Sequence, residues 1–103
     1  MAARLKVILD CCDPERLAAF WTEALGYAYP GTYGQCWPLL PPVASSHEPW
    51  LVLQHVSEPK SGKNRMHLDL QVADLEAEVR RLEALGAHAS PRGPRALEAP
   101  SGT

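Results

Sequence analysis

The sequence has no long apolar segment. None of its 103 residues lies in a run approaching the roughly 18 consecutive apolar residues that a membrane-spanning helix requires. The N-terminal stretch MAARLKVILDCCDPER turns polar and acidic before the apolar region of a secretory signal could develop. We therefore expect no membrane association and a cytoplasmic location.

The sequence also has no block of charge of one sign. Ten Lys and Arg residues against twelve Asp and Glu residues give a formal net charge of −2, and both signs are dispersed along the chain. A nucleic-acid-binding protein usually carries a clustered basic face. We therefore expect no nucleic-acid partner.

Cysteine is scarce and its spacing is unlike that of metal or disulfide frameworks. There are three cysteines, an odd number, and no C-x2-C pair of the kind that holds structural zinc. Cys11 and Cys12 are adjacent, so in a strand they would point to opposite faces. Cys12 precedes a helix start, but the neighbouring Asp13 disfavours a thiolate. We expect reduced thiols that pack as small apolar groups, and we identify no catalytic nucleophile.

What the sequence does contain is an internal repeat. Residues 5–27, LKVILDCCDPERLAAFWTEALGY, resemble residues 66–88, MHLDLQVADLEAEVRRLEALGAH. Each copy has a strand-like run, an Asp, a helical pattern and the tetrapeptide Glu-Ala-Leu-Gly, and the two tetrapeptides are sixty residues apart. The repeat predicts two related modules, each of which begins with a strand and a helix.

The first copy predicts a strand over residues 5–12 and a helix that follows it. Asp13 suits the N-cap, Pro14 suits the first helical position, and Gly26 suits the end of the helix. Along the strand, one face is apolar and the other is mixed. The apolar face carries Leu5, Val7, Leu9 and Cys11, and the mixed face carries Lys6, Ile8, Asp10 and Cys12.

The second copy predicts the same arrangement, with a strand over residues 66–72 and a helix capped by Asp74 and ended by Gly86. The mixed face of this strand carries His67, Asp69 and Gln71. Since each helix has one apolar stripe, the simplest assembly places both helices on one side of a sheet. The opposite side, with the mixed faces, would line a cavity or meet solvent.

Residues 27–65 predict three short strands separated by Gly and Pro. The clearest is EPWLVLQHV, with Trp50 and Gln54 on one face and Leu51 and Leu53 on the other. We expect one α+β domain over residues 1–90, with modules at about 5–56 and 66–90. Residues 91–103 are rich in proline and predict an irregular or disordered tail, which leaves the second module incomplete.

The segments DPERLAAFWTEALGY and PKSGKNRMHLDLQVADLEAEVRRLEALGA resemble the vicinal oxygen chelate superfamily, in particular its small glyoxalase-like and bleomycin-resistance-like proteins. The resemblance covers about residues 5–90. It implies paired βαβββ modules that curl a mixed sheet into a cup, with helices on one face. It also implies a small-molecule substrate and, in the enzymes, a bound divalent metal.

The metal-ligand positions that the resemblance implies are poorly filled in this chain. They fall near Lys6, near Gln54 and on His67, and a fourth would lie on a last strand that we do not expect here. A lysine ammonium has no lone pair to donate to a metal, and catalytic sites usually have three protein ligands. We therefore expect no cofactor. A divalent metal on His67 and Gln54 is the alternative.

Six residues are candidates for contact with an organic ligand, and each also has a purely structural interpretation. The charged ones could instead pair with one another, the histidine could satisfy neighbouring groups, and the tryptophan could belong to the core, as could Trp37. The candidates are Lys6, Asp10, Trp50, Gln54, His67 and Asp69.

Three functions remain open from the sequence. The first is a metal-independent protein that binds a small organic molecule in a cup, for sequestration or sensing. The second is a metal-dependent lyase, isomerase or dioxygenase, and the third is a shortened structural module that only dimerises. Because an incomplete module leaves a strand edge unpaired, we expect a homodimer in each case.

Overall fold

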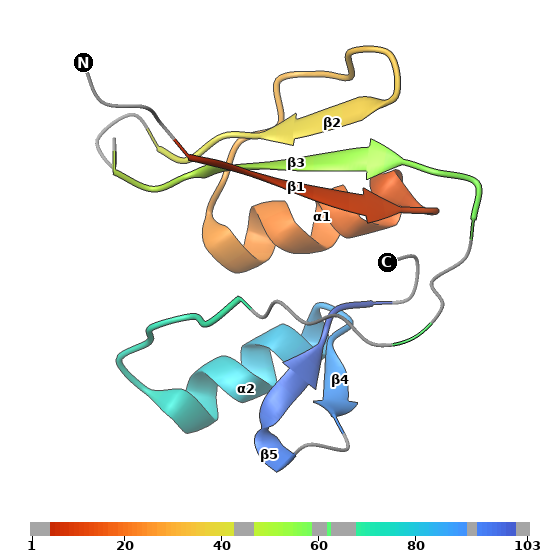
Figure 1. Ribbon diagram of the computed structural model, residues 1–103. Helices are drawn as coiled ribbons and strands as arrows, with labels where there is room; N and C mark the ends of the chain where they lie inside the picture. The colour runs from red at the N-terminus through yellow and green to blue at the C-terminus, as the bar shows by residue number, and fades with distance from the viewer. Residues whose placement is uncertain (1–4, 43–46, 59–61, 63–67, 91–92, 101–103) are drawn as a thin grey trace.

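The computed structural model describes residues 5–42, 47–58, 62, 68–90 and 93–100. It is an α+β structure, as expected, with a mixed sheet, two helices and a two-stranded hairpin (Figure 1). Among the described residues, no helix has the length and apolar character needed to cross a membrane. In chain order the elements are β1 (Lys6–Cys11), α1 (Pro14–Leu25), β2 (Cys36–Leu39), β3 (Trp50–His55), α2 (Leu75–Ala84), β4 (His88–Ser90) and β5 (Gly93–Glu98).

The first module forms a three-stranded sheet in the order β1-β3-β2. Strand β1 runs parallel to β3, with Lys6 opposite Trp50 and Asp10 opposite Gln54. Strand β2 runs antiparallel to β3 on its other side. Because β2 is an edge strand, it accommodates Pro38, which has no backbone N–H to donate.

The two faces of this sheet follow the alternation in the sequence. The odd-numbered residues of β1 and β3 point toward α1, and Leu53 is fully buried there. Burying such a side chain contributes about 1.5–3 kcal/mol. The core cluster under the sheet consists of Cys11, Leu17, Ala18, Leu39, Leu51 and Leu53.

Helix α1 begins and ends at the residues that the sequence predicts. The side chain of Asp13 accepts a hydrogen bond from the backbone N–H of Arg16 at 3.2 Å, and Pro14 occupies the first turn. Gly26 adopts φ of 70°, a left-handed conformation that glycine tolerates best, and its N–H bonds to the carbonyl of Thr22. These contacts fix the helix directly after β1.

Both helices lie on the same side of the three-stranded sheet, as expected, with α1 against the sheet and α2 beyond it, packed against α1 (Figure 1). Phe20 and Ala24 of α1 meet Leu82 and Ala87 of the second module in a separate apolar cluster. The physical reason is that α1 has apolar side chains on two sides, so it is buried between the sheet and α2.

Arg81 of α2 reinforces this contact between the modules. Its guanidinium donates to the backbone carbonyls of Glu23 at 3.0 Å and Ala24 at 2.9 Å, near the C-terminus of α1. Its other N–H groups bond both carboxylate oxygens of Glu78, at 2.6 and 2.8 Å. This pairing lowers the pKa of Glu78 and raises that of Arg81. A charged side chain of one module thus satisfies helix-end carbonyls of the other.

Three expectations about strands need correction. Residues 68–72, expected to form a strand, are in none; Leu68 and Leu70 are 45% and 36% exposed, so no core of the described chain buries the apolar face that the alternation predicts. The first of the three strands expected after α1 is reduced to a bridge between Ala28 and Leu40, since Pro30 and Gly31 follow at once. In the segment expected to be irregular, Gly93–Glu98 form β5 and pair with β4, so backbone hydrogen bonding outweighs an unfavourable composition.

The core position of Leu53 predicts a large cost of truncation. Leu53→Ala should lower the free energy of unfolding by about 2–5 kcal/mol, because the lost contacts leave a cavity. Leu5→Ala, at a position that is 73% exposed, should change it by less than about 0.5 kcal/mol. Urea unfolding measures both, and equal effects of the two substitutions would contradict the assignment of the core.

The buried thiol of Cys11 predicts a loss of stability in alkali. Burial, and to a smaller extent Cys12 and Asp13, raises its pKa from 9.0 to about 11. Between these pH values the unfolded chain has lost this proton while the folded chain keeps it, so the free energy of unfolding falls as the pH rises. Urea unfolding from pH 8 to 11 should show a shallower fall for Cys11→Ala than for Cys12→Ala. Identical slopes would refute this assignment.

Candidate functional site

The face of the sheet turned away from α1 carries four of the six predicted ligand contacts. Lys6 lies opposite Trp50, and Asp10 lies opposite Gln54, so all four point to the same side. Ile8 and Val52 lie between the two pairs. We call Lys6, Ile8, Asp10, Trp50, Val52 and Gln54 the open sheet face.

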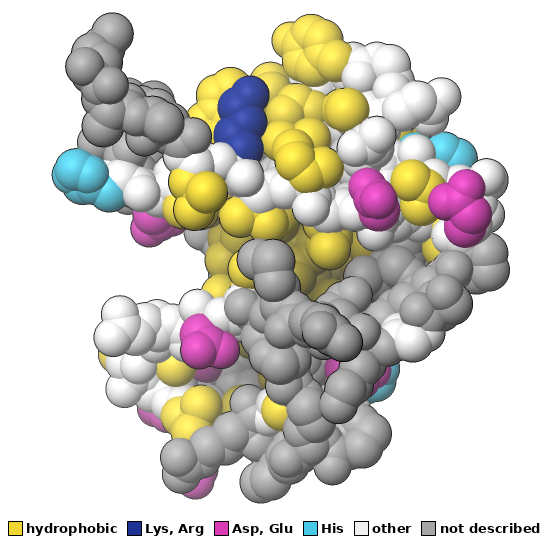
Figure 2. Space-filling model, in the orientation of Figure 1, with side chains coloured by type: hydrophobic (Ala, Val, Ile, Leu, Met, Phe, Trp, Pro, Cys, Tyr) yellow, Lys and Arg dark blue, Asp and Glu magenta, His cyan; other side chains and the backbone are white. Residues whose placement is uncertain are grey.

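This face is partly apolar, and apart from Val52, which is buried, its side chains are exposed. Ile8 is 52% exposed and Trp50 is 38% exposed, which is high for large apolar side chains. Figure 2 shows hydrophobic side chains gathered over the sheet, with a basic side chain among them. An exposed apolar surface with a few polar groups is typical of a contact site.

The contact between Lys6 and Trp50 is the most specific feature of the face. The ammonium nitrogen of Lys6 lies 4.9 Å from the centroid of the indole ring. Such a pair contributes about 0.5–1 kcal/mol when exposed to solvent. Among the described residues, no ion pair joins Lys6 to Asp10 or Asp69. The alternative in which these charges pair with one another is therefore wrong for the described residues.

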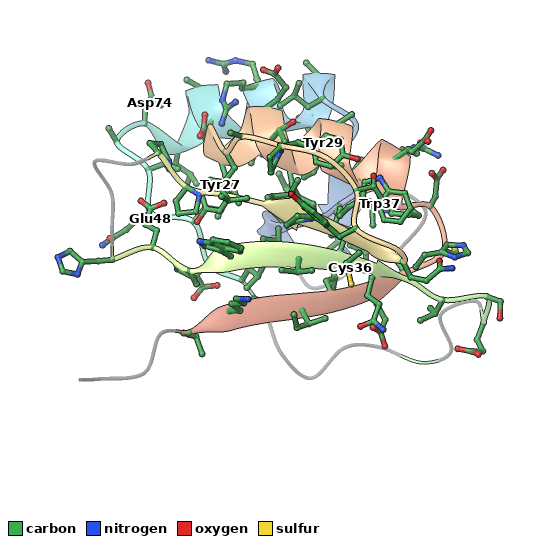
Figure 3. All side chains as sticks on the ribbon, turned by 90° about the horizontal axis from the view of Figure 1, so that it is seen from above. Tyr27, Tyr29, Cys36, Trp37, Glu48 and Asp74 are labelled. Atoms are coloured by element: carbon green, nitrogen blue, oxygen red, sulfur yellow. The ribbon has the colours of Figure 1, made fainter. Side chains whose placement is uncertain are left out.

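Tyr27 fixes the chain at the start of β3, next to Trp50. Its hydroxyl donates a hydrogen bond of 2.8 Å to the carbonyl of Pro49 (Figure 3). Burial, followed by the nearby carboxylate of Glu48, raises the pKa of Tyr27. A protonated hydroxyl is the form that can donate this bond, so the contact persists at neutral pH.

The other two predicted contacts are not placed on this face. His67 lies outside the described residues. Asp69 lies in the exposed segment before α2, where the chain forms no strand, and no described hydrogen bond or ion pair links it to the open sheet face. The prediction grouped them with Lys6 on the assumption that residues 66–72 form a strand.

The described residues do not fit the divalent metal of the related enzymes. Of the implied positions that are described, Lys6 has no lone pair to donate and Gln54 offers only a neutral amide oxygen. In this part of the chain there is no group of three His, Cys, Asp or Glu side chains placed to hold an ion. We therefore derive no chemistry through a metal.

Trp37 does not share the face of Trp50. In the register it lies opposite Leu53, on the side of the sheet that α1 covers. There it borders a cleft of about 310 Å³ beside α1. The sequence did not predict this cleft, although four of its lining residues are spaced so that they share one side of α1. The lining consists of Glu15, Ala18, Ala19, Thr22, Tyr29 and Trp37.

Comparison with known proteins identifies the family. A search of curated proteins and a search of solved structures found no match. The family model described as a glyoxalase-like domain matches residues 6–103, nearly the whole chain. The match extends beyond the limit of residue 90 that the sequence repeat suggests, and it includes β5. The chain therefore belongs to the glyoxalase-like domain family, in agreement with the resemblance found in its sequence.

Proposed function

We propose that this protein binds a small, flat organic acid on the open sheet face, without a metal, to sequester or sense it. The observation that carries the proposal is the Lys6 ammonium held 4.9 Å from the centroid of an accessible tryptophan ring. The ring offers a surface for stacking, and the ammonium offers a partner for an anionic group.

The rest of the face supplies selectivity for such a ligand. The pair of Asp10 and Gln54 lies four residues along the strands from the pair of Lys6 and Trp50. At about 3.3 Å per residue this separation is about 13 Å, the length of a two-ring or three-ring molecule. Ile8 and Val52 give an apolar floor between the pairs, and Gln54 can donate or accept a hydrogen bond at the far end.

Binding of this kind needs stacking, hydrogen bonds and one charge pair. It needs neither a metal nor a nucleophile, which agrees with the poor fit of the described residues to a divalent ion. The three free thiols suit a reducing compartment, which supports the cytoplasm as the location.

We also propose that two copies associate through β1. Within the described chain, β1 pairs only with β3, so its other edge is open. Leu5 and Ile8 beside this edge are 73% and 52% exposed. Open strand edges flanked by apolar side chains favour pairing with a second chain. Such pairing would lengthen the sheet and with it the open sheet face.

The ligand proposal predicts binding of 2-naphthoate, a flat aromatic anion. In NMR titrations of the ¹⁵N-labelled protein, the indole N–H of Trp50 and the side-chain amide of Gln54 should shift together. Lys6→Met should weaken the affinity about tenfold, since a charged hydrogen bond contributes about 1.5–3 kcal/mol. Trp50→Ala should weaken it at least as much, because the stacking surface is lost.

Two controls separate this site from nonspecific binding. Tyr33→Ala removes an aromatic ring that is 70% exposed elsewhere, and the affinity should not change. Treatment with a metal chelator should also leave it unchanged. Loss of binding in the presence of chelator, or equal binding by Lys6→Met, would contradict the proposal.

Association through β1 predicts a dimer by analytical ultracentrifugation. Ile8→Lys should shift the equilibrium toward monomer, because a charged side chain beside a strand edge disfavours pairing. Tyr33→Lys introduces the same charge on another exposed large side chain and should leave the dimer intact. A wild-type protein that stays monomeric at millimolar concentration would refute this proposal and leave the ligand proposal standing.

A further inference from the structure

We propose that the cleft between α1, Tyr29 and Trp37 is a second binding site, selective for a small organic cation with an apolar body. It lies on the side of the sheet opposite the open sheet face, because Trp37 pairs in register with Leu53 and points toward α1. The inference is therefore independent of the proposed acid-binding function.

Small side chains on one side of α1 form the base of the cleft, and two aromatic side chains from other elements complete its lining. Four residues at helical spacing line it from α1, and the two in the middle are Ala18 and Ala19, whose methyl groups leave space. Tyr29 comes from the loop after the helix and Trp37 comes from β2, and Figure 3 shows both beside α1. The volume of about 310 Å³ is at the small end for ligand sites and suits a molecule with one ring.

The charge of the lining favours a cation. Glu15 is its charged member, and among the described residues it forms no ion pair or hydrogen bond. The faces of the Tyr29 and Trp37 rings carry the negative side of the aromatic quadrupole. Among the residues that the structure describes, no Lys or Arg lines the cleft. The described lining thus combines one carboxylate with two aromatic rings, a set that favours an ammonium group.

The hydroxyl of Thr22, which lines the cleft, can accept a hydrogen bond from a ligand but does not have its own hydrogen free to donate. The Thr22 hydroxyl directs its hydrogen toward the carbonyl of Ala18 at 2.8 Å, one turn back along α1. Its oxygen lone pairs remain available. A ligand with N–H donors can thus bond to Thr22 or to Glu15, two helical turns apart on α1, whereas an anionic ligand would meet a lining without a charged donor among the described residues.

The test uses phenethylammonium, with 2-phenylethanol and 3-phenylpropanoate as neutral and anionic analogues of similar size. In NMR titrations, phenethylammonium should shift the indole N–H of Trp37 and leave that of Trp50 in place. Glu15→Gln should weaken the affinity about tenfold, since it removes a charged partner. Tyr29→Leu, at an exposed position, should weaken it about threefold to fivefold through loss of one aromatic face.

The repeat in the sequence supplies a matched control. Glu76 is the second residue of α2, as Glu15 is the second residue of α1, so both carboxylates lie in the first turn, where a helix N-terminus favours negative charge. Glu76→Gln should therefore lower helix stability as Glu15→Gln does, and leave the affinity for phenethylammonium unchanged. Weakening of equal size in both variants would overturn the proposal.

Two further results would also overturn it. One is binding of 2-phenylethanol or 3-phenylpropanoate as tightly as phenethylammonium, which would mean that the cleft selects only for an apolar ring. The other is the absence of any shift at Trp37 with about 10 mM phenethylammonium, a concentration that reveals even millimolar affinities.

Discussion

The in-register parallel pairing of β1 with β3 is the constraint on which both the core and the candidate site depend. Because side chains alternate along a strand, the register that buries Leu53 over α1 also places Lys6 beside Trp50 on the opposite face. A shift of one residue would exchange the two faces. The free energy of core packing therefore holds Lys6 and Trp50, the proposed ligand contacts, in place, although neither belongs to the core.

Helix α1 makes contacts on three of its sides. One side covers the sheet, a second packs against α2, and a third lines the cleft below Tyr29. The guanidinium of Arg81 in α2 also donates hydrogen bonds to backbone carbonyls at the C-terminal end of α1 and so links the two modules. Because the proposed acid site and the proposed cation site lie on opposite sides of the sheet, substitutions at one should leave the other intact.

Local signals in the sequence predicted the first module well. The alternation in β1 and the caps at Asp13 and Gly26 were confirmed, since each depends on neighbouring residues, whereas β3 alternates only in part because Val52 is also buried. The contacts of the second module were not predictable, because the similarity to β1 does not tell whether residues 68–72 have a neighbouring strand to pair with, and in the structure they form no strand. Strand β5 was not predicted either, because the proline-rich composition does not show that β4 lies beside it to pair with. The open sheet face followed from periodicity, whereas the cleft at Trp37 required knowing which face of β2 meets α1.

The most direct test of the two-faced sheet is solvent paramagnetic relaxation enhancement of the wild-type protein with a neutral gadolinium chelate. The methyl groups of Ile8, the indole N–H of Trp50 and the side-chain amide of Gln54 should relax strongly, and the methyl groups of Leu51 and Leu53 should be protected. Adding 2-naphthoate should protect Trp50 and Gln54 together. Strong enhancement at Leu51 and Leu53, with Ile8 and Gln54 protected, would show that α1 covers the opposite face of the sheet and would contradict the account.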